Sequence, residues 1–442
     1  MKLRLSYFVV PILLVVGYFL LTAYLPKYSG QYIIMVLLFL ADLYLWSSVK
    51  KKIFSNTIWL RLLMVSVYWL PLAMVAFIMV GAVFVPIIDW NDSFRTLWFG
   101  FILVFYTSKL LPVFFLLLAD MVRLINKSIR LLNKEERQNI VKTEEGMSRS
   151  KFLQYLGFIS GGLVMGTMFT GMFKWVYQFM VSDQKIVIKN IPSGLKGFKI
   201  VQISDMHLGS WANPKPLMQA VEMINNMNAD IVVFTGDLVN FSTKEAFKYQ
   251  NTLSQVKAKQ GVFTILGNHD YGDYVKWPDA ASKQKNMDDL FSFYENIGWK
   301  LLNNESELFE TSNGSLALVG VENWGANPRF PKHGDLDKAI NGFADADVKV
   351  LLSHDPSHWE KKVLPSSYNI DLTLAGHTHG FQFGFESKNF KWSPAKWLYK
   401  HWAGLYTDVN SGNYLYVNRG IGSIGYPGRI GILPEITLIE LV

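Results

Sequence analysis

Five long apolar segments constrain this chain more than any other feature, because a helix needs about 20 apolar residues to cross a bilayer. The segments cover residues 7–25, 31–48, 58–83, 97–122 and 152–173. No small-residue cleavage site follows the first segment, so it does not read as a signal peptide. The sequence therefore predicts five transmembrane helices. We expect a four-helix transmembrane region at 1–125, a basic cytoplasmic linker at 126–151, a fifth helix at 152–180 and a second domain at 184–442.

The distribution of Lys and Arg among the loops predicts the orientation, because cytoplasmic loops carry an excess of both. One basic cluster, Lys50 to Lys52 with Arg61, lies between the second and third segments, and eight more basic residues occupy positions 123–151. The other two loops carry little more than Lys27 and Arg95. We therefore expect a cytoplasmic N terminus and, after five crossings, a C-terminal domain on the outer face. Much of the net charge of +8 comes from these loops, which weakens its value as a sign of nucleic-acid binding.

Two charged residues, Asp42 and Lys109, fall inside apolar segments at similar depth. A charge in the hydrocarbon region is expensive, so we expect the two side chains to pair. The pair could be a transport or relay site, or a structural ion pair. The structural interpretation is favoured, because a transport path usually needs more charges than two. The fifth segment also contains Gly157-x-x-x-Gly161 and Gly162-x-x-x-Gly166, a spacing that permits close helix packing.

Five short apolar runs in the remainder share one property, since each is followed at once by Asp, His or Asn. The runs cover 199–204, 231–235, 262–266, 348–352 and 370–375 and alternate with helical stretches, which predicts an α/β domain. The carboxyl ends of strands in such a sheet face a common crevice, the usual ligand site. We therefore expect these side chains to converge: Asp205, His207, Asp237, Asn268, His269, Asp270, His354, His377 and His379.

Seven of these residues offer oxygen or nitrogen donors to a metal, namely Asp205, His207, Asp237, Asn268, His354, His377 and His379. A catalytic zinc ion takes about three protein ligands. Seven ligands therefore predict two ions about 3.5–4 Å apart with one bridging carboxylate. The chain has no cysteine, and mixed imidazole and carboxylate ligands favour Mn, Fe or Zn. In Gly-His-Thr-His, the two imidazoles project to one side, so each can reach a different ion.

The motifs Asp205-x-His207, Gly236-Asp237, Gly267-Asn268-His269-Asp270, His354 and Gly376-His377-x-His379 resemble, as a set, those of the calcineurin-like metallophosphoesterases. The resemblance covers residues 185–442. Within that family the chain is most similar to the bacterial membrane-associated branch, which includes enzymes acting on phospholipid-like or UDP-diacylglucosamine substrates. The resemblance implies an α/β four-layer metallophosphoesterase sandwich around two mixed sheets. It also implies a bacterial inner (cytoplasmic) membrane, and the loop charges predict a catalytic domain on the outer, periplasmic or extracellular, face of that membrane.

The same resemblance implies a role for each residue. Asp205, His207 and His379 would hold the first ion, Asn268, His354 and His377 would hold the second, and Asp237 would bridge them. A metal-bound hydroxide would attack phosphorus, while His269 would contact the phosphate and protonate the leaving group. Asp270 would orient His269. The chain departs from the family pattern at Asn240, where many relatives carry an acid, and at Phe381, where a second glycine is common.

Two stretches near the C terminus bear on the substrate. Residues 391–402 interleave aromatic and basic side chains, which suits an element resting on lipid headgroups and equally a packed surface helix. The glycine-rich residues 418–429 carry Arg419 and Arg429, which could bind a substrate phosphate. A purely structural loop is favoured there, because glycine-rich turns are common.

The sequence therefore predicts a membrane-anchored, metal-dependent phosphoric ester hydrolase, that is a phosphodiesterase, phosphatase or pyrophosphatase. Its partners would be the lipid bilayer and a phosphorylated small-molecule or lipid-linked substrate. A nuclease-type phosphodiesterase is the second interpretation, and the outer location argues against it. A non-catalytic membrane sensor or scaffold is the third, and the complete ligand set with His269 argues against that. The substrate, the native metal and the oligomeric state stay open.

Overall fold

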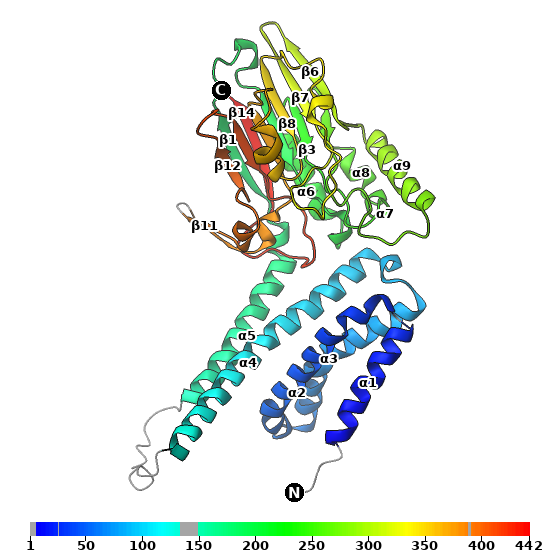
Figure 1. The fold of residues 1–442 in the computed structure, drawn as a ribbon, viewed down its shortest axis with the longest axis vertical. Helices are drawn as coiled ribbons and strands as arrows, with labels where there is room; N and C mark the ends of the chain where they lie inside the picture. Colours follow the sequence, from blue (N-terminus) through cyan, green and yellow to red (C-terminus); the bar gives the residue numbers. More distant parts are fainter. Residues whose placement is uncertain (1–5, 25, 133–148, 388–389) are drawn as a thin grey trace. The chain divides into compact units, whose positions relative to one another are not determined.

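The computed structural model describes residues 6–24, 26–132, 149–387 and 390–442 (Figure 1). The chain forms two compact units. The first unit comprises Met1–Trp90 and Trp98–Phe169, and the second comprises Asn91–Leu97 and Thr170–Val442. The second unit therefore includes two short pieces of the membrane helices, the first turn of one and the last turn of another.

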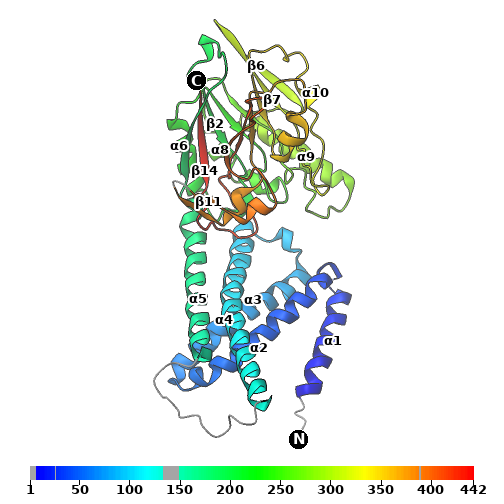
Figure 2. The same cartoon turned by 60° about the vertical axis from the view of Figure 1, so that its left-hand side comes forward.

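Five long helices follow one another in the first half of the chain. They are α1 (Ser6–Tyr24), α2 (Tyr32–Phe54), α3 (Ile58–Phe84), α4 (Asp92–Leu132) and α5 (Arg149–Phe173), as both views show (Figures 1 and 2). Within the described residues, four spans are long and apolar enough to cross a membrane: Ser29–Phe54, Ile58–Phe84, Asp92–Ile129 and Arg149–Tyr177.

The structure thus gives four candidate spans where the sequence predicts five. The first predicted segment forms α1, of which Leu14–Tyr24 qualifies only as a shorter apolar helix. That α1 crosses the membrane stays a prediction. The expected orientation of the second unit does not depend on it, because the basic cluster lies at the adjoining ends of α2 and α3 and four spans follow the same inside–outside order. The predicted linker at 126–151 is partly helical at its start, since α4 continues to Leu132. Residues 133–148 lie outside the described residues.

Two glycines of α5 bring it close to α4, as the Gly-x-x-x-Gly spacing predicts. A Cβ added at Gly157 would lie 2.9 Å from Phe115, and one added at Gly161 would lie 2.7 Å from the carbonyl oxygen of Ser108. Any larger side chain at either position would force the two helices apart. The second predicted pair differs, because a Cβ at Gly162 or Gly166 would meet no atom of the described residues within 4 Å.

The predicted pairing of Asp42 with Lys109 is confirmed. Nζ of Lys109 lies 2.7 Å from Oδ1 of Asp42 and also donates to the carbonyl oxygen of Tyr68 at 2.7 Å. The hydroxyl of Tyr106 donates to Oδ2 of Asp42 at 3.0 Å. The carboxylate is buried and its two oxygens are both satisfied, as a charge away from water requires. These contacts favour the structural interpretation of the pair.

Asp42→Asn and Lys109→Met should not be additive, because each single change leaves the other buried group without its partner. We expect each to lower the free energy of unfolding by about 1 kcal/mol or more, and the double variant to lose less than the sum. Unfolding of the full chain in detergent measures this. The exposed pair Asp120–Arg123 is the matched control, with an expected coupling of about 0.3–0.5 kcal/mol. Additive losses at Asp42 and Lys109 would show that the pair contributes nothing.

Two six-stranded mixed sheets form the centre of the second unit. The first has the order β1-β14-β2-β3-β4-β5 and the second β12-β13-β9-β8-β7-β6. The strands of the first sheet are β1 (Met180–Ile186), β2 (Lys199–Ile203), β3 (Ile231–Phe234), β4 (Val262–Thr264), β5 (Trp299–Leu301) and β14 (Glu435–Leu441). Those of the second are β6 (Glu305–Thr311), β7 (Gly314–Gly320), β8 (Val348–Leu352), β9 (Leu372–Ala375), β12 (Gly404–Thr407) and β13 (Tyr414–Val417).

The central strands are buried on both faces, and their continuous Val, Ile and Leu runs reflect that. One core lies between the sheets and contains residues of both, such as Ile200 and Val233 of the first and Val350 and Leu372 of the second. Two further cores cover the outer faces. The first sheet packs against α6 (Lys215–Asn226), α8 (Gln250–Leu253) and α9 (Ala280–Asn296), and the second against α10 (Leu336–Ala339). Helices, two sheets and helices make four layers, which confirms the predicted sandwich.

A third, two-stranded sheet stands apart from the sandwich. It pairs β10 (Phe385–Ser387) with β11 (Phe390–Trp392) in antiparallel register, with Phe385 opposite Trp392. This hairpin lies in the stretch that directly follows the last predicted metal ligand, His379.

Candidate metal centre

The five predicted strands are β2, β3, β4, β8 and β9, and each one leads directly into a predicted ligand. β2, β3 and β4 are parallel neighbours in the first sheet, so their carboxyl ends share one edge. β8 and β9 are parallel neighbours in the second sheet. The candidate centre therefore takes side chains from both sheets, at the edge where the strands end.

The backbone at this edge is held in an unusual conformation. Five ligand residues have positive φ: Asp205 (50°), His207 (46°), Asp237 (61°), His377 (71°) and His379 (51°). This left-handed region is uncommon for residues other than glycine, and it persists only where the surrounding structure enforces it. Such strain clusters at functional sites, because it aims side chains in directions that a regular strand exit does not allow.

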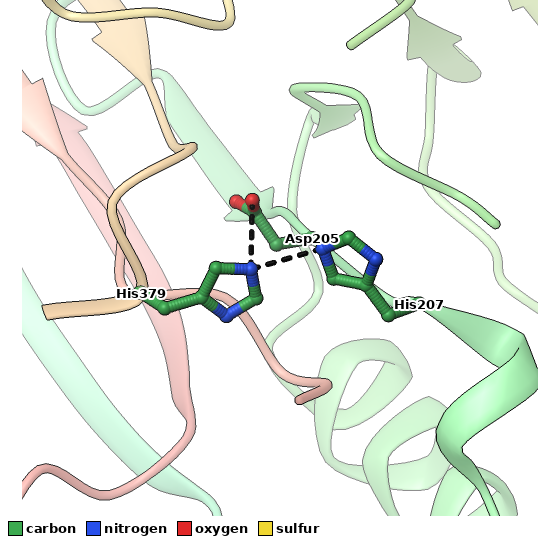
Figure 3. A group of neighbouring side chains, drawn as sticks. All are labelled: Asp205, His207 and His379. Atoms are coloured by element: carbon green, nitrogen blue, oxygen red, sulfur yellow. Dashed lines mark hydrogen bonds and ion pairs between the residues drawn. The ribbon is translucent and has the colours of Figure 1, made fainter. Parts of the chain in front are cut away.

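Asp205, His207 and His379 form the first donor set (Figure 3). Nε2 of His379 lies 2.9 Å from Nε2 of His207 and 3.3 Å from Oδ1 of Asp205. Two ligands bound at right angles about 2.1 Å from one ion are about 3.0 Å apart. The three atoms are therefore spaced as the ligands of a single cation.

Asp237, His354 and His377 form the second donor set. Nε2 of His354 lies 3.3 Å from Oδ2 of Asp237 and 3.2 Å from Nδ1 of His377. Nδ1 of His354 donates to the carbonyl oxygen of Thr235 at 2.7 Å, which leaves Nε2 unprotonated in the neutral ring. A ligand imidazole is commonly fixed in this way by a carbonyl behind it.

One carboxylate oxygen belongs to both sets. Oδ2 of Asp237 lies 3.6 Å from Nε2 of His207 as well as 3.3 Å from Nε2 of His354. Its Oδ1 accepts a hydrogen bond from the backbone N–H of His269 at 2.9 Å, which fixes the carboxylate plane. Asp237 therefore lies between the two donor sets, within 3.6 Å of an imidazole from each.

Asn268, the seventh predicted ligand, lies in neither of these two donor sets, but its amide oxygen is free to bind a cation. Its Nδ2 donates to the hydroxyl of Tyr274 at 2.8 Å, which orients the amide. Its Oδ1 is buried and has no hydrogen-bond partner among the described residues. A buried carbonyl oxygen without a partner is unfavourable unless something else binds it, and a cation would.

The electrostatics of the site favour positive charge. Burial alone would raise the pKa of Asp205, but the nearby imidazole of His379 outweighs it and lowers that pKa below its usual range. Burial likewise opposes ionisation of Asp237, but His354 and His269 hold the pKa of its carboxyl well below the usual value. Both carboxylates are therefore ionised at neutral pH, inside a pocket that excludes water. A divalent cation would stabilise them more effectively than the imidazoles alone do.

His269 lies beside the two donor sets, with its ring centroid 5.0 Å from that of His207. Nδ1 lies 2.8 Å from the carbonyl oxygen of Asn240, and because a carbonyl only accepts, Nδ1 must donate. Nε2 is thus the ring atom available for a substrate. Asn240 contributes its backbone to this arrangement, so an acidic side chain at that position is not needed for it.

The role expected for Asp270 needs a correction. Its carboxylate accepts hydrogen bonds from the backbone N–H groups of Asp237 at 2.9 Å, Leu238 at 2.8 Å and Gly267 at 2.8 Å. Asp270 therefore ties the loop after β3 to the loop after β4, and the carbonyl of Asn240 is what orients the ring of His269. Asp270 acts on the whole site through its two ligand loops.

The two arginines of the glycine-rich loop hold that loop together. Arg419 forms ion pairs with Glu435 and Glu386. Arg429 is fully buried and donates to the carbonyl oxygens of Arg419, Gly420 and Gly422, while its Nη2 lies 3.3 Å from Nδ1 of His379. Burial of both side chains argues against direct phosphate binding. Arg429 instead supports a metal ligand from behind.

Sequence reasoning did not single out Tyr399 as part of the site. Its hydroxyl lies 2.7 Å from Nε2 of His377 and fixes the second face of that ligand. Tyr399 and Asp355 also border a cavity of about 340 Å³, whose wall combines polar and apolar groups. The sequence did contain a sign of this residue, because Tyr399 lies in the aromatic stretch 391–402. Nothing in that stretch distinguishes Tyr399 from the other aromatic residues, so only the fold shows that it lies beside His377.

The first turn of α4 also belongs to this unit. Arg95 forms a buried ion pair with Glu245 at 3.3 Å, and Oε2 of Glu245 accepts from the backbone N–H of Asn240 at 2.6 Å. Thr96 donates to the carbonyl oxygen of Gly209, two residues after His207. The hydrophobic pattern places residues 91–96, with Arg95, in the loop before the apolar segment 97–122, so this contact was not foreseen.

Replacing ligands should change the metal content in steps. The full chain loaded with Mn is expected to hold about two ions, His379→Ala about one, and Asp237→Ala fewer than one, because Asp237 serves both donor sets. Elemental analysis after gel filtration measures this. His333→Asn, an exposed histidine away from the strand ends, is the matched control and should match the parent chain. Two ions retained in Asp237→Ala would contradict a bridging role.

Two family models match separate parts of the chain. Calcineurin-like phosphoesterase matches residues 198–381, and the transmembrane domain of a probable calcineurin-like phosphoesterase matches residues 29–175. The second match covers α2 to α5 and begins after α1, in agreement with the four candidate spans.

Individual relatives support both matches. A transmembrane protein with metallophosphoesterase domain from Danio rerio is 32% identical over 269 residues, which is 59% of this chain and 57% of that protein. The match thus spans little more than half of that relative's length. An uncharacterized metallophosphoesterase of Campylobacter jejuni is 25% identical and aligns over 93% of this chain and 97% of its own length. The UDP-2,3-diacylglucosamine pyrophosphatase LpxG of Chlamydia muridarum is 27% identical over 52% of this chain and 79% of its own length.

The members of this family are generally metal-dependent phosphoester hydrolases with a dimetal centre, and the two donor sets at the strand ends have the composition that such a centre needs. The chain therefore carries a calcineurin-like phosphoesterase domain and, before it, the transmembrane domain of a probable calcineurin-like phosphoesterase.

Proposed function

We propose that the second unit hydrolyses a phosphate ester or pyrophosphate bond at a dimetal centre held by Asp205, His207, Asp237, Asn268, His354, His377 and His379. The observation that carries this proposal is the position of Asp237, whose Oδ2 lies within 3.6 Å of an imidazole from each donor set. One carboxylate between two such sets suits a pair of ions, and ion pairs of this kind serve in-line displacement at phosphorus. Mn, Fe and Zn all fit imidazole and carboxylate ligands.

When bound, two divalent ions polarise the phosphoryl oxygens and supply a nucleophilic water at neutral pH. The residues of the chain do the rest. The left-handed backbone conformation directs both donor sets toward the same edge of the sheets. A phosphate could therefore contact ions held by both sets. His269, with Nδ1–H fixed on the carbonyl of Asn240, presents Nε2 to the phosphate, and in its doubly protonated form it gives the Nε2 proton to the departing oxygen and is left as the neutral ring. Asp270 keeps the loops after β3 and β4 in register while this happens.

A lipid-linked phosphate is the favoured substrate class within this function. The chain carries four candidate membrane spans, so its substrate must be accessible at a membrane. The relative LpxG is named for a pyrophosphate substrate that carries acyl chains. The cavity beside Tyr399 offers about 340 Å³ for the polar part of such a molecule.

The two other interpretations have less support. A nuclease would need a long basic groove for the phosphate backbone, and the two arginines nearest the site are buried in ion pairs and loop contacts. A non-catalytic sensor would have no use for His269 held in a defined tautomer. Turnover of a simple phosphodiester by the Mn-loaded chain would exclude the sensor, and a comparison of a phospholipid with single-stranded DNA would test the nuclease.

His269→Asn should abolish most of the turnover without removing metal. Because a positioned general acid contributes about 10²–10⁴-fold, we expect kcat on an alkyl phosphodiester to fall by about 10²-fold or more. The loss should be smaller with a p-nitrophenyl leaving group, which needs no proton. His333→Asn is the control for a histidine outside the site. Unchanged kcat with the poor leaving group would refute the role of His269.

The expected orientation can be tested by labelling, because the chain has no cysteine of its own. Val409→Cys places a thiol at a position that is 95% exposed in the second unit, and Lys51→Cys places one in the last turn of α2. In sealed right-side-out vesicles, a membrane-impermeant maleimide should label position 409 at once and position 51 only after permeabilisation. The opposite pattern would place the catalytic unit in the cytoplasm.

A further inference from the structure

An apolar surface follows the last metal ligand directly. Within the stretch 381–398, six large apolar side chains are between 44% and 70% exposed. We call them the aromatic patch: Phe381, Phe383, Phe385, Phe390, Trp397 and Leu398. A soluble domain rarely gathers so many exposed apolar groups on one short stretch, and such a surface usually marks a site of contact.

Ring contacts gather the aromatic groups around the hairpin of β10 and β11 into two clusters, and the pairing of Phe385 with Trp392 connects the clusters. Phe385 faces Phe390 with ring centroids 6.2 Å apart. Trp392 links the rest, because its ring lies 6.3 Å from that of Phe383 and 5.8 Å from that of Trp397. The aromatic groups therefore form one surface that a single partner could cover.

The hairpin needs such a partner. β10 and β11 pair only with each other, and five of their six residues are exposed. An isolated two-stranded sheet is marginal in water, and here it presents its aromatic groups to solvent. Phe381 adds to this imbalance, since it is held exposed at a φ of 60° that a bulky residue rarely adopts. A strained backbone conformation two residues after His379 therefore holds an aromatic ring at the surface.

The end of a membrane helix identifies the partner. The last turn of α5 is part of the second unit, and the carbonyl oxygen of Gly171 accepts a hydrogen bond from the N–H of Arg429 at 3.3 Å. The next residue, Ile430, forms a β-bridge with Phe383, and its carbonyl oxygen accepts from the N–H of Gly384 at 2.9 Å. Residues 429–430 therefore connect the backbone of the patch, at Phe383 and Gly384, to the last turn of α5, at Gly171.

The composition of the patch agrees with that location. Trp and Phe rings favour the boundary between headgroups and acyl chains, and Trp175 and Tyr177 follow α5 at the same end. Lys396 is exposed in the same stretch, and basic side chains beside apolar ones are typical of surfaces that rest on anionic lipid.

We propose that the aromatic patch inserts into the outer leaflet beside α5 and that a membrane-resident amphiphile with a phosphate ester reaches the metal centre across Phe381, without leaving the lipid phase. The insertion stands on the patch and the α5 contact alone. The substrate route rests in addition on the proposed hydrolase function. Two experiments separate these parts.

The first experiment measures insertion and needs no activity. Single cysteines at Phe385, Phe390 and Trp397, in the cysteine-free full chain, receive a nitroxide spin label after reconstitution into phosphatidylethanolamine–phosphatidylglycerol vesicles. The labels should be relaxed by oxygen, which concentrates in lipid, and protected from an aqueous nickel chelate. Labels at Phe291 in α9 and at Val409 in the turn between β12 and β13, exposed positions outside the patch, should show the reverse.

Two outcomes of this experiment overturn the proposal. Labels on the patch that respond mainly to the nickel chelate would place the hairpin in water. Labels protected from both relaxing agents would show that a protein covers the patch, either a second copy of the chain or another partner, and not lipid.

The second experiment measures the route with two probes that share one leaving group. Bis(p-nitrophenyl) phosphate is soluble, whereas hexadecyl p-nitrophenyl phosphate partitions into the vesicle. In Phe385→Ser with Phe390→Ser, the ratio of turnover on the amphiphile to turnover on the soluble diester should fall by about tenfold. Phe291→Ser with Val409→Ser is the matched control and should keep the parent ratio.

An unchanged ratio, with labels that do report lipid, would overturn the route and leave the insertion standing. If the parent chain hydrolysed neither probe, the result would count against the hydrolase function. It would not count against the insertion, because the label experiment does not depend on turnover.

Discussion

The carboxylate of Asp237 is the contact on which the rest of the site depends. It stands between imidazoles that arrive from different strands, His207 after β2 and His354 after β8, and these strands belong to different sheets. One oxygen can serve both only if the two sheets pack in a fixed register, with their carboxyl edges level. The apolar core between the sheets provides that register, since Ile200, Val233 and Leu372 are fully buried in it. Packing far from the chemistry therefore sets the spacing of the donors.

Much of this could be read from the sequence, for a physical reason. Buried parallel strands are short continuous apolar runs, and a polar residue placed directly after such a run must lie at the rim of a sheet. Five such runs with Asp, His or Asn at their ends were enough to predict the strands and the convergence of the ligands. The membrane segments were equally clear, since four of the five contain candidate spans among the described residues and the crossing of α1 stays a prediction. The charged pair inside the membrane followed from the cost of leaving either charge alone.

What the sequence could not supply depends on backbone direction. The left-handed conformation of Asp205, His207 and His379 has no signature in residue type, because these residues are not glycines. The partner of His269 is a carbonyl group, that of Asn240, and every residue has one. Asp270 was assigned to its neighbour in the chain, whereas it binds N–H groups from a loop about thirty residues away. Arg419 and Arg429 look available in a glycine-rich loop, and only the fold shows that Glu435, Glu386 and loop carbonyls already occupy them.

The ion pair of Arg95 with Glu245 changes what counts as the catalytic domain. Residues 91–97 precede that domain by two membrane helices in the chain, yet they complete its interior, and Glu245 is 3% exposed beneath them. A polypeptide excised at residue 184 would retain every metal ligand and still lack the counter-charge of a buried acid, together with the hydroxyl of Thr96 that holds the carbonyl of Gly209. The second unit therefore cannot be separated from the membrane helices by cutting a single linker, because residues 91–97, which begin α4, belong to that unit.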